Sequence, residues 1–251
     1  MNIDLKTEKE IEIMKEGGIR LKKVVKALLK DITVGMTSKH IDDLAENLIE
    51  KEGGEPSFKK VKDYFWTTCL PINDQVVHTP PSNRKLNQGD LLTLDIGMYF
   101  KGYHTDFATT IYIGKIPDKE TKRFLETGKK ALALAIEKAK TGNRLGDISA
   151  TIEKEIYGQG YFVLKELTGH GIGKQLHEDP YVFGFRERPV ERTIKIQPGL
   201  VIAIEVIYSK SSEEIAYEKN SDWSVVSADR SLSACFEHTV AIMEKNSLVL
   251  T

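Results

Sequence analysis

Four acidic side chains interrupt apolar, strand-like runs in this sequence of 251 residues. Burial of a carboxylate is unfavourable by several kcal/mol unless the group is protonated, paired with a cation or bound to a metal. A single residue of this kind is compatible with a buried salt bridge. Four of them, with histidines nearby, indicate a charged centre that offsets the cost; they are Asp95, Asp106, Glu205 and Glu237.

The first two carboxylates are expected on one face of a β-hairpin. Lys101-Gly102 suits a two-residue turn, and a turn there places Asp95 opposite Ala108. Asp106 then lies on the same face, one diagonal neighbour away from Asp95. Two carboxylates this close repel each other unless a cation lies between them. The alternatives are therefore a salt bridge to Lys or Arg and a bound metal ion.

Histidines supply a second ligand type. His170 stands among three glycines in the segment 169–173, and glycines let a backbone approach another group closely. This context favours a ligand or catalytic role for His170. His177 follows seven residues later. His78 precedes Thr79-Pro80-Pro81, and its own context is equally compatible with a surface loop.

Carboxylates combined with a neutral imidazole form a hard, oxygen-rich set of ligands. Because no cysteines cluster with them, a structural zinc site is disfavoured, and the set suits two divalent ions such as Mn, Co, Fe or Zn. Paired ions of this kind can polarise a carbonyl, so hydrolysis of an amide or ester is the expected reaction.

The composition excludes several other classes of protein. Lys and Arg (36) nearly balance Asp and Glu (37), which argues against nucleic-acid binding and against a polybasic membrane anchor. The N-terminus has no apolar signal core, and no apolar run approaches the roughly 20 residues of a membrane span. The two cysteines, Cys69 and Cys235, are expected to be reduced thiols. We therefore expect a cytoplasmic protein.

The sequence repeats one order of elements. Helices are expected over residues 7–29 and 38–54, capped by Thr7 and Ser38, and strands follow to residue 114. The second half repeats this order, with helices over 118–140 and 147–157 and then strands to the C-terminus. The strand segments match as well, since Asp95 and Glu205 occupy equivalent places. Chance similarity of amphipathic segments is the alternative to a duplication.

The five candidate ligands, in their order along the chain, resemble the metal ligands of the pita-bread metallopeptidases. The stretches that carry the resemblance are most similar to those of type I methionine aminopeptidases; they are His104-Thr105-Asp106, Thr168 to Gly173, His177-Glu178-Asp179-Pro180, Ala203-Ile204-Glu205 and Asp229 to Thr239. The resemblance implies an α+β fold with two pseudo-symmetric α/β halves and a curved antiparallel sheet covered by helices. It implies one catalytic domain, residues 1–251, with half-repeats of approximately 7–114 and 118–251.

The implied activity is that of a dinuclear metal-dependent aminopeptidase. Such an enzyme removes the initiator methionine from nascent polypeptides at the ribosome, and we expect a cytoplasmic monomer. By the resemblance, Asp95 chelates one ion, His170 and Glu205 hold the other, and Asp106 and Glu237 bridge both.

The resemblance also implies roles in the reaction and in substrate binding. A metal-bound hydroxide attacks the first peptide bond while Glu205 transfers the proton, and His78 and His177 contact the substrate. The residues that match the methionine pocket are Tyr64, Cys69, Leu176 and Trp223.

The chain departs from the family pattern at four places, none of which removes a ligand. Thr79-Pro80-Pro81 replaces Gly-Ile-Pro after His78, and Val206 replaces proline. Leu176 stands where phenylalanine is common, and Cys235 stands where glutamine is common. Two other functions remain open: a related hydrolase of Xaa-Pro bonds, which usually carries an additional N-terminal domain, and a non-catalytic protein that uses the cleft to bind peptides or a partner.

Overall fold

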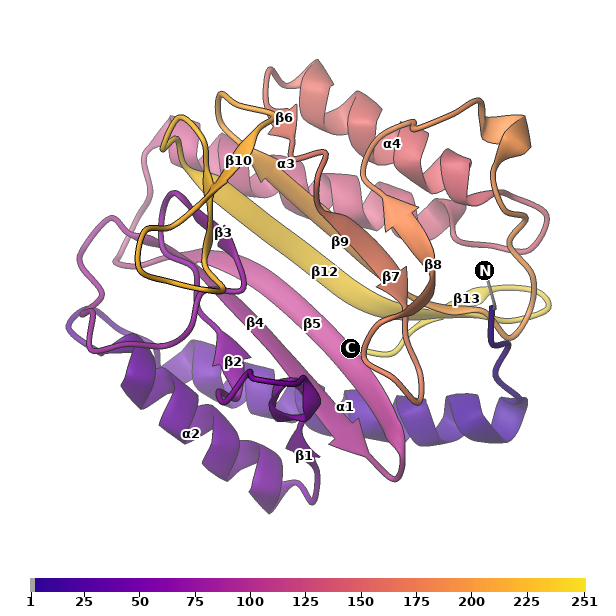
Figure 1. The fold of residues 1–251 in the computed structure, drawn as a ribbon, viewed down its shortest axis with the longest axis horizontal. Coiled ribbons are helices and arrows are strands. Elements are labelled where there is room, and N and C mark those ends of the chain that lie inside the picture. The colour runs from indigo at the N-terminus through magenta and orange to yellow at the C-terminus, as the bar shows by residue number, and fades with distance from the viewer. Residues whose placement is uncertain (1–2) are drawn as a thin grey trace.

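The computed structural model describes residues 3–251 of the chain. Within this range, four α-helices pack against a ten-stranded antiparallel sheet, and a three-stranded sheet lies beside it (Figure 1). The helices are α1 (Glu8–Asp31), α2 (Ser38–Lys51), α3 (Lys119–Lys138) and α4 (Leu145–Gly158). Two short 3₁₀ helices span Phe58–Lys60 and Val190–Arg192.

The strands differ widely in length. The ten-stranded sheet contains β1 (Glu55–Pro56), β2 (Thr68–Cys69), β4 (Leu91–Phe100), β5 (Tyr103–Tyr112), β6 (Phe162–Val163), β7 (Thr168–Gly171), β8 (Glu178–Phe183), β9 (Val201–Ser209), β12 (Ser233–Ile242) and β13 (Ser247–Val249). The small sheet contains β3 (Gln75–Val77), β10 (Ile215–Tyr217) and β11 (Val225–Ser227).

The four longest strands lie side by side in the order β4-β5-β12-β9. Strands β4 and β5 come from the first half of the chain, and β9 and β12 come from the second half. Helices α1 and α2 lie along the β4–β5 half of the sheet, and α3 and α4 lie along the β9–β12 half (Figure 1). The expected α+β class, with helices covering an antiparallel sheet, is confirmed.

Helix ends follow the capping rules, with two corrections to the sequence-based prediction. The capping box of Thr7 and Glu10 begins α1 as predicted. Helix α2 is capped by Thr37 rather than Ser38, because the Ser38 hydroxyl donates instead to the carbonyl of Ser82. Helix α4 begins two residues earlier than predicted, at Leu145, because the Asp147 carboxylate accepts a hydrogen bond from the preceding Arg144 backbone N–H.

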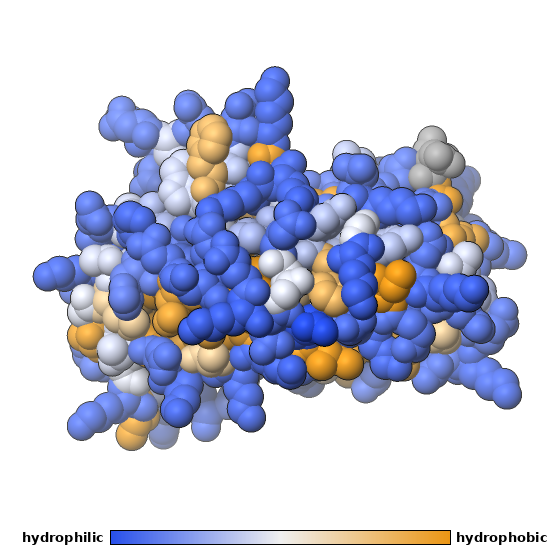
Figure 2. All heavy atoms as spheres, turned by 90° about the horizontal axis from the view of Figure 1, so that it is seen from below, coloured by the Kyte–Doolittle hydropathy of each residue, from blue (hydrophilic) through white to orange (hydrophobic). Residues whose placement is uncertain are grey.

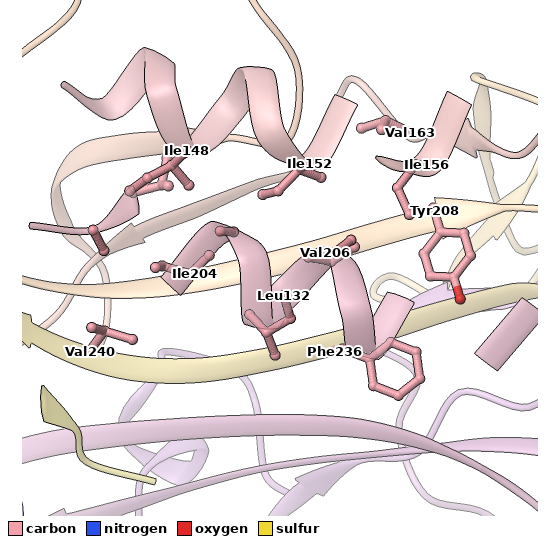
Figure 3. Close-up of a cluster of buried hydrophobic side chains, with 14 of the residues drawn as sticks. Leu132, Ile148, Ile152, Ile156, Val163, Ile204, Val206, Tyr208, Phe236 and Val240 are labelled. Atoms are coloured by element: carbon pink, nitrogen blue, oxygen red, sulfur yellow. The ribbon is translucent and has the colours of Figure 1, made fainter. Parts of the chain in front are cut away.

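Apolar side chains fill the layer between helices and sheet. Ile204 and Val206 of β9 and Phe236 of β12 pack against Leu132 of α3 and Ile152 of α4 (Figure 3). Leu94 and Ile96 of β4 pack against α1 and α2 in the same way. Successive side chains of a strand point to opposite faces of the sheet. The residues between these apolar positions therefore point to the face that the helices do not cover.

The outer surface on the α1 and α2 side is mostly hydrophilic. Viewed from below, it shows hydrophobic residues only in separated groups (Figure 2). None of the helices in residues 3–251 is long and apolar enough to span a bilayer.

Candidate metal centre

Asp95 and Asp106 lie together on the uncovered face of the ten-stranded sheet. The β4–β5 hairpin turns through Lys101 and Gly102, and both have positive φ (48° and 94°), as a tight turn with a glycine allows. Asp95 pairs with Ala108, as the turn predicted. Asp106 pairs with Gly97 and is therefore the diagonal neighbour of Asp95 on the same face.

Glu205 and Glu237 complete the set of carboxylates from the other half of the sheet. They are direct cross-strand partners on β9 and β12. Glu237 also pairs with Ala108 of β5, so the two halves meet at this position. His170 on β7 pairs with Ala203 of β9, two residues from Glu205, and so points to the same face. The five predicted ligands thus come from five strands to one side of the sheet.

Glycines in β7 make the position of His170 possible. A Cβ atom on Gly169 would lie 2.4 Å from the carbonyl oxygen of Ala203 in β9. A Cβ atom on Gly171 would lie 2.2 Å from the carbonyl oxygen of Asp179 in β8. The close approach expected from the glycines is therefore an approach of neighbouring strands, and His170 between them lines the cavity.

Every site residue named from the sequence lines one cavity of ≈ 290 Å³. One side of the cavity is formed by the acidic residues and His170, and the other side is mostly apolar. Its lining includes Phe58, Val61 and Val77, which the sequence analysis missed, together with Tyr64, Cys69, His78, Asp95, Asp106, His170, Leu176, His177, Glu205, Trp223 and Glu237. The missed residues are ordinary apolar residues, and no local signal in the sequence separates them from other core positions.

In the described part of the chain, the four carboxylates have no lysine or arginine partner. Among residues 3–251, neither Lys nor Arg forms an ion pair with any of them, and the only such contact joins Glu205 Oε1 to His170 Nε2 at 3.5 Å. Ligand atoms of Asp106, His170 and Glu237 lie within 4.8 Å of one another, and Oε1 of Glu237 is buried without a hydrogen-bond partner in the described chain. A salt bridge as the alternative to a metal is therefore wrong.

Burial changes the protonation of the site strongly. It raises the pKa of Asp106 to about 7 and raises the pKa values of Asp95, Glu205 and Glu237 well above the usual range, with a further contribution from the neighbouring carboxylates. Burial lowers the pKa of His170 to about 3, which keeps its imidazole neutral. Nδ1 of His170 lies 2.9 Å from the Gly171 carbonyl, which can only accept, so Nε2 is left free to bind a metal.

The two other histidines stand at the mouth of the cavity. Both have exposed side chains, and the ring of His177 lies 4.5 Å from the ring of His170. His78 has φ of 56°, a left-handed conformation that is unfavourable for histidine and recurs at functional sites. The next residue is Thr79, whose hydroxyl lies 2.8 Å from the hydroxyl of Ser224, and both residues are buried. This hydrogen bond joins the His78 loop to the residue after Trp223.

An aromatic wall forms the apolar part of the cavity. The rings of Tyr64 and Trp223 lie 5.1 Å apart in an edge-to-face arrangement. The hydroxyl of Tyr64 donates to the Thr68 carbonyl at 2.8 Å and lies 3.0 Å from the sulfur of Cys69. Leu176 is 7% exposed and also contributes to the wall. Such a slot suits a flexible apolar side chain.

Comparison with known proteins agrees with this geometry. The sequence model of metallopeptidase family M24 matches residues 12–244. Methionine aminopeptidase 1 of Bacillus subtilis is 36% identical over 246 residues, which cover 98% of each chain. The chain belongs to the methionine aminopeptidases of metallopeptidase family M24. The resemblance found in the sequence is thereby confirmed.

The fold of this M24 member is similar to those of solved structures from the same family of folds. The methionine aminopeptidase of Thermotoga maritima is 31% identical and superposes with a TM-score of 0.95, covering 100% of this chain and 99% of that one. A prolidase from Pyrococcus furiosus, 24% identical, has a TM-score of 0.79 and shares the fold, and this chain spans 65% of its length. The expected pita-bread fold of this M24 metallopeptidase is confirmed.

Proposed function

We propose that the cavity holds two divalent metal ions and that the protein, with these ions bound, removes methionine from the N-terminus of proteins. The observation that carries the proposal is a set of four carboxylates, Asp106 and Glu237 buried and Asp95 and Glu205 partly buried, beside a neutral imidazole. None of the four has a cationic Lys or Arg partner in residues 3–251. Buried polar atoms are normally hydrogen-bonded, so the unpartnered Oε1 of Glu237 fits a missing cation.

Position on the sheet supports the ligand assignment that the family resemblance implies. Asp106 and Glu237 lie in the compact group with His170 and are the two proposed bridging ligands. Asp95, at the β2–β4 side, is the further ligand of one ion. His170 and Glu205, whose ligand atoms are 3.5 Å apart, would hold the other ion. The ions are drawn from Mn, Co, Fe and Zn, all of which accept carboxylate and imidazole.

Ions held by these residues would act as Lewis acids toward the scissile carbonyl and would lower the pKa of a bound water. Glu205 faces the cavity and is the carboxylate that takes the proton from the attacking water and passes it to the leaving amine. His78 and His177, at the mouth, donate hydrogen bonds to the carbonyl oxygen as it gains negative charge. The methionine side chain enters the slot between Tyr64 and Trp223.

The two halves of the chain support a single catalytic domain over residues 1–251, with half-repeats of approximately 7–114 and 118–251. Helices α2 and α4, and strands β4 and β9, occupy matching places in the two halves. Because each half contributes two of the four carboxylates, neither half contains a complete site. We further propose that the protein acts as a cytoplasmic monomer on nascent chains at the ribosome, which gel filtration and co-sedimentation with ribosomes test.

The activity is tested on the metal-free protein with a Met-Ala-Ser peptide. Addition of Mn or Co is expected to restore release of free methionine, and the same peptide with a blocked amine is expected to remain intact. Cleavage of an Ala-Pro dipeptide in preference to Met-Ala-Ser would indicate an Xaa-Pro peptidase. Retention of both ions without cleavage of any of these peptides would indicate a non-catalytic binding protein.

A further inference from the structure

Among residues 3–251, Lys6 is the only lysine or arginine that is buried, and nothing in the proposed mechanism uses it. The residue is 5% exposed and lies just before α1. Its Nζ forms an ion pair with Oε2 of Glu178 and donates a hydrogen bond to the Asp4 carbonyl at 2.9 Å. The side chains of Lys6 and Glu178 are only 2% and 11% exposed. A buried ion pair that costs desolvation calls for a structural or functional reason.

The fold keeps a space open for this lysine. A Cβ atom on Gly173 would lie 2.3 Å from Cε of Lys6 and 2.9 Å from Oε1 of Glu178. The absence of a side chain at Gly173, the last glycine of segment 169–173, therefore allows the aliphatic part of the Lys6 side chain to reach Glu178. The backbone N–H of Lys6 also donates to the carbonyl of Gly199 at 2.7 Å, which fixes the N-terminal segment beside the turn before β9.

Glu178 in turn closes the loop that carries two substrate-binding residues. Its Oε1 accepts a hydrogen bond from the backbone N–H of Gln175 at 2.9 Å. The loop between these two residues consists of Leu176 and His177, which line the cavity. The Gln175 carbonyl accepts from the Gly173 N–H at 3.0 Å, so the loop is held at both ends.

We infer that Lys6 is a positioning residue for the enzyme, whose ion pair with Glu178 holds Leu176 and His177 in place around the substrate. The inference rests on the proposed function, in which Leu176 lines the methionine pocket and His177 contacts the substrate carbonyl. It predicts that a change at the N-terminal segment alters substrate binding and turnover together, although Lys6 does not touch the substrate.

The test compares Lys6→Met, which keeps most of the stem and removes the charge, with Lys130→Met. Lys130 pairs with Glu155 at 2.8 Å on the helix side of the sheet, and is the control for loss of an ion pair. Lys6→Met is expected to raise KM for Met-Ala-Ser and to lower kcat, with kcat/KM reduced about 10- to 100-fold, while the number of Mn ions bound stays unchanged. Lys130→Met is expected to retain the wild-type constants.

Hydrogen exchange of the Gln175 amide provides a readout that does not require activity. Lys6→Met is expected to accelerate this exchange, and Lys130→Met is not. In Lys6→Met, the Glu178 carboxylate is left without its cationic partner. The double variant Lys6→Met/Glu178→Gln removes this charge as well. It is expected to be more thermally stable than Lys6→Met, while KM and the exchange of the Gln175 amide remain altered. Should Lys6→Met misfold, this double variant supplies the same comparison.

Two results would overturn the inference. One is wild-type kinetics and wild-type protection of Gln175 in the folded Lys6 variants. The other is a kcat that falls only in proportion to the fraction of folded enzyme, with KM unchanged, because that pattern indicates a purely structural role. Failure of the proposed function is recognised separately, since the wild-type protein would then release no methionine with Mn or Co bound.

Discussion

Glu205 of β9 and Glu237 of β12 are direct cross-strand partners, and no Lys or Arg among residues 3–251 pairs with either carboxylate. Like charges directly opposite each other destabilise a sheet. The repulsion is therefore relieved only when at least one of the two groups is protonated or when a cation lies between them. We infer that the sheet is built around cation binding.

Replacement of His170 by Ala removes the only nitrogen ligand proposed for the site. The variant is expected to lose activity toward Met-Ala-Ser and to bind Mn more weakly, because Nε2 of His170 faces Glu205 at 3.5 Å. Metal content after dialysis and the rate of methionine release are the measurements. His40→Ala on the exposed face of α2 is the control and is expected to leave both unchanged. Full activity of His170→Ala with both ions retained would contradict its assignment as a ligand.

Asp106→Asn tests the proposed bridging role. Binding of both ions is expected to weaken together in a calorimetric titration, because each ion loses a ligand. Asp42→Asn is a matched control, since Asp42 is also buried and accepts hydrogen bonds from Thr67 and Thr68. That control is expected to lower the free energy of unfolding by about 1–3 kcal/mol without changing the number of ions bound. Loss of one ion with normal affinity for the other argues against a bridge.

Metal binding is expected to release protons at neutral pH. Burial raises the pKa of Asp106 to about 7 and raises the pKa values of the other three carboxyl groups well above their usual range, so the metal-free site carries protons that a cation displaces. His170 contributes none, because burial lowers its pKa to about 3 and it is already neutral.

The number of protons released on metal binding depends on pH. Since the folded-state pKa values are raised, the carboxyl groups are protonated below them and release decreases as the pH rises through them. Calorimetric titrations with Mn near pH 6.5, in buffers of different ionisation enthalpy, measure the release. A binding enthalpy that does not depend on the buffer would show that the carboxylates are already ionised without metal.

Thr79→Val tests whether the Thr79 hydroxyl holds the His78 loop. It removes the hydrogen bond to Ser224 while keeping the volume, and is expected to lower kcat/KM about tenfold. Thr79→Ser keeps the hydroxyl and is expected to restore most of the rate. Thr127→Val, which removes a buried hydroxyl on α3, is expected to change stability alone. Equal kinetics for Thr79→Val and Thr127→Val would show that Thr79 has no role in positioning His78.

The sequence was sufficient to predict the features that depend on local geometry. A two-residue turn at Lys101-Gly102 and the alternation of strand side chains together determine that Asp95 faces Ala108. The same alternation predicts that Asp106 shares the face of Asp95, and the pairing of Asp106 with Gly97 agrees with this. These predictions required no knowledge of the distant chain.

Contacts between distant segments could not be predicted. Thr37 and Ser38 can both cap a helix, and a hydrogen bond to Ser82 decides between them. Lys6 and Glu178 are separated by 172 positions, and a lysine before a helix normally remains in solvent. Their pairing arises only once the N-terminal segment has docked beside β9, so no local pattern reveals it.

A crystal grown with ample Mn tests the central claim most directly. Anomalous scattering is expected to show two ions in the cavity, about 3.5–4 Å apart. Asp106 and Glu237 are expected to touch both ions, with Asp95 on one of them and His170 and Glu205 on the other. An empty cavity, or one in which the five side chains turn away from each other to form ordinary ion pairs, would contradict the account.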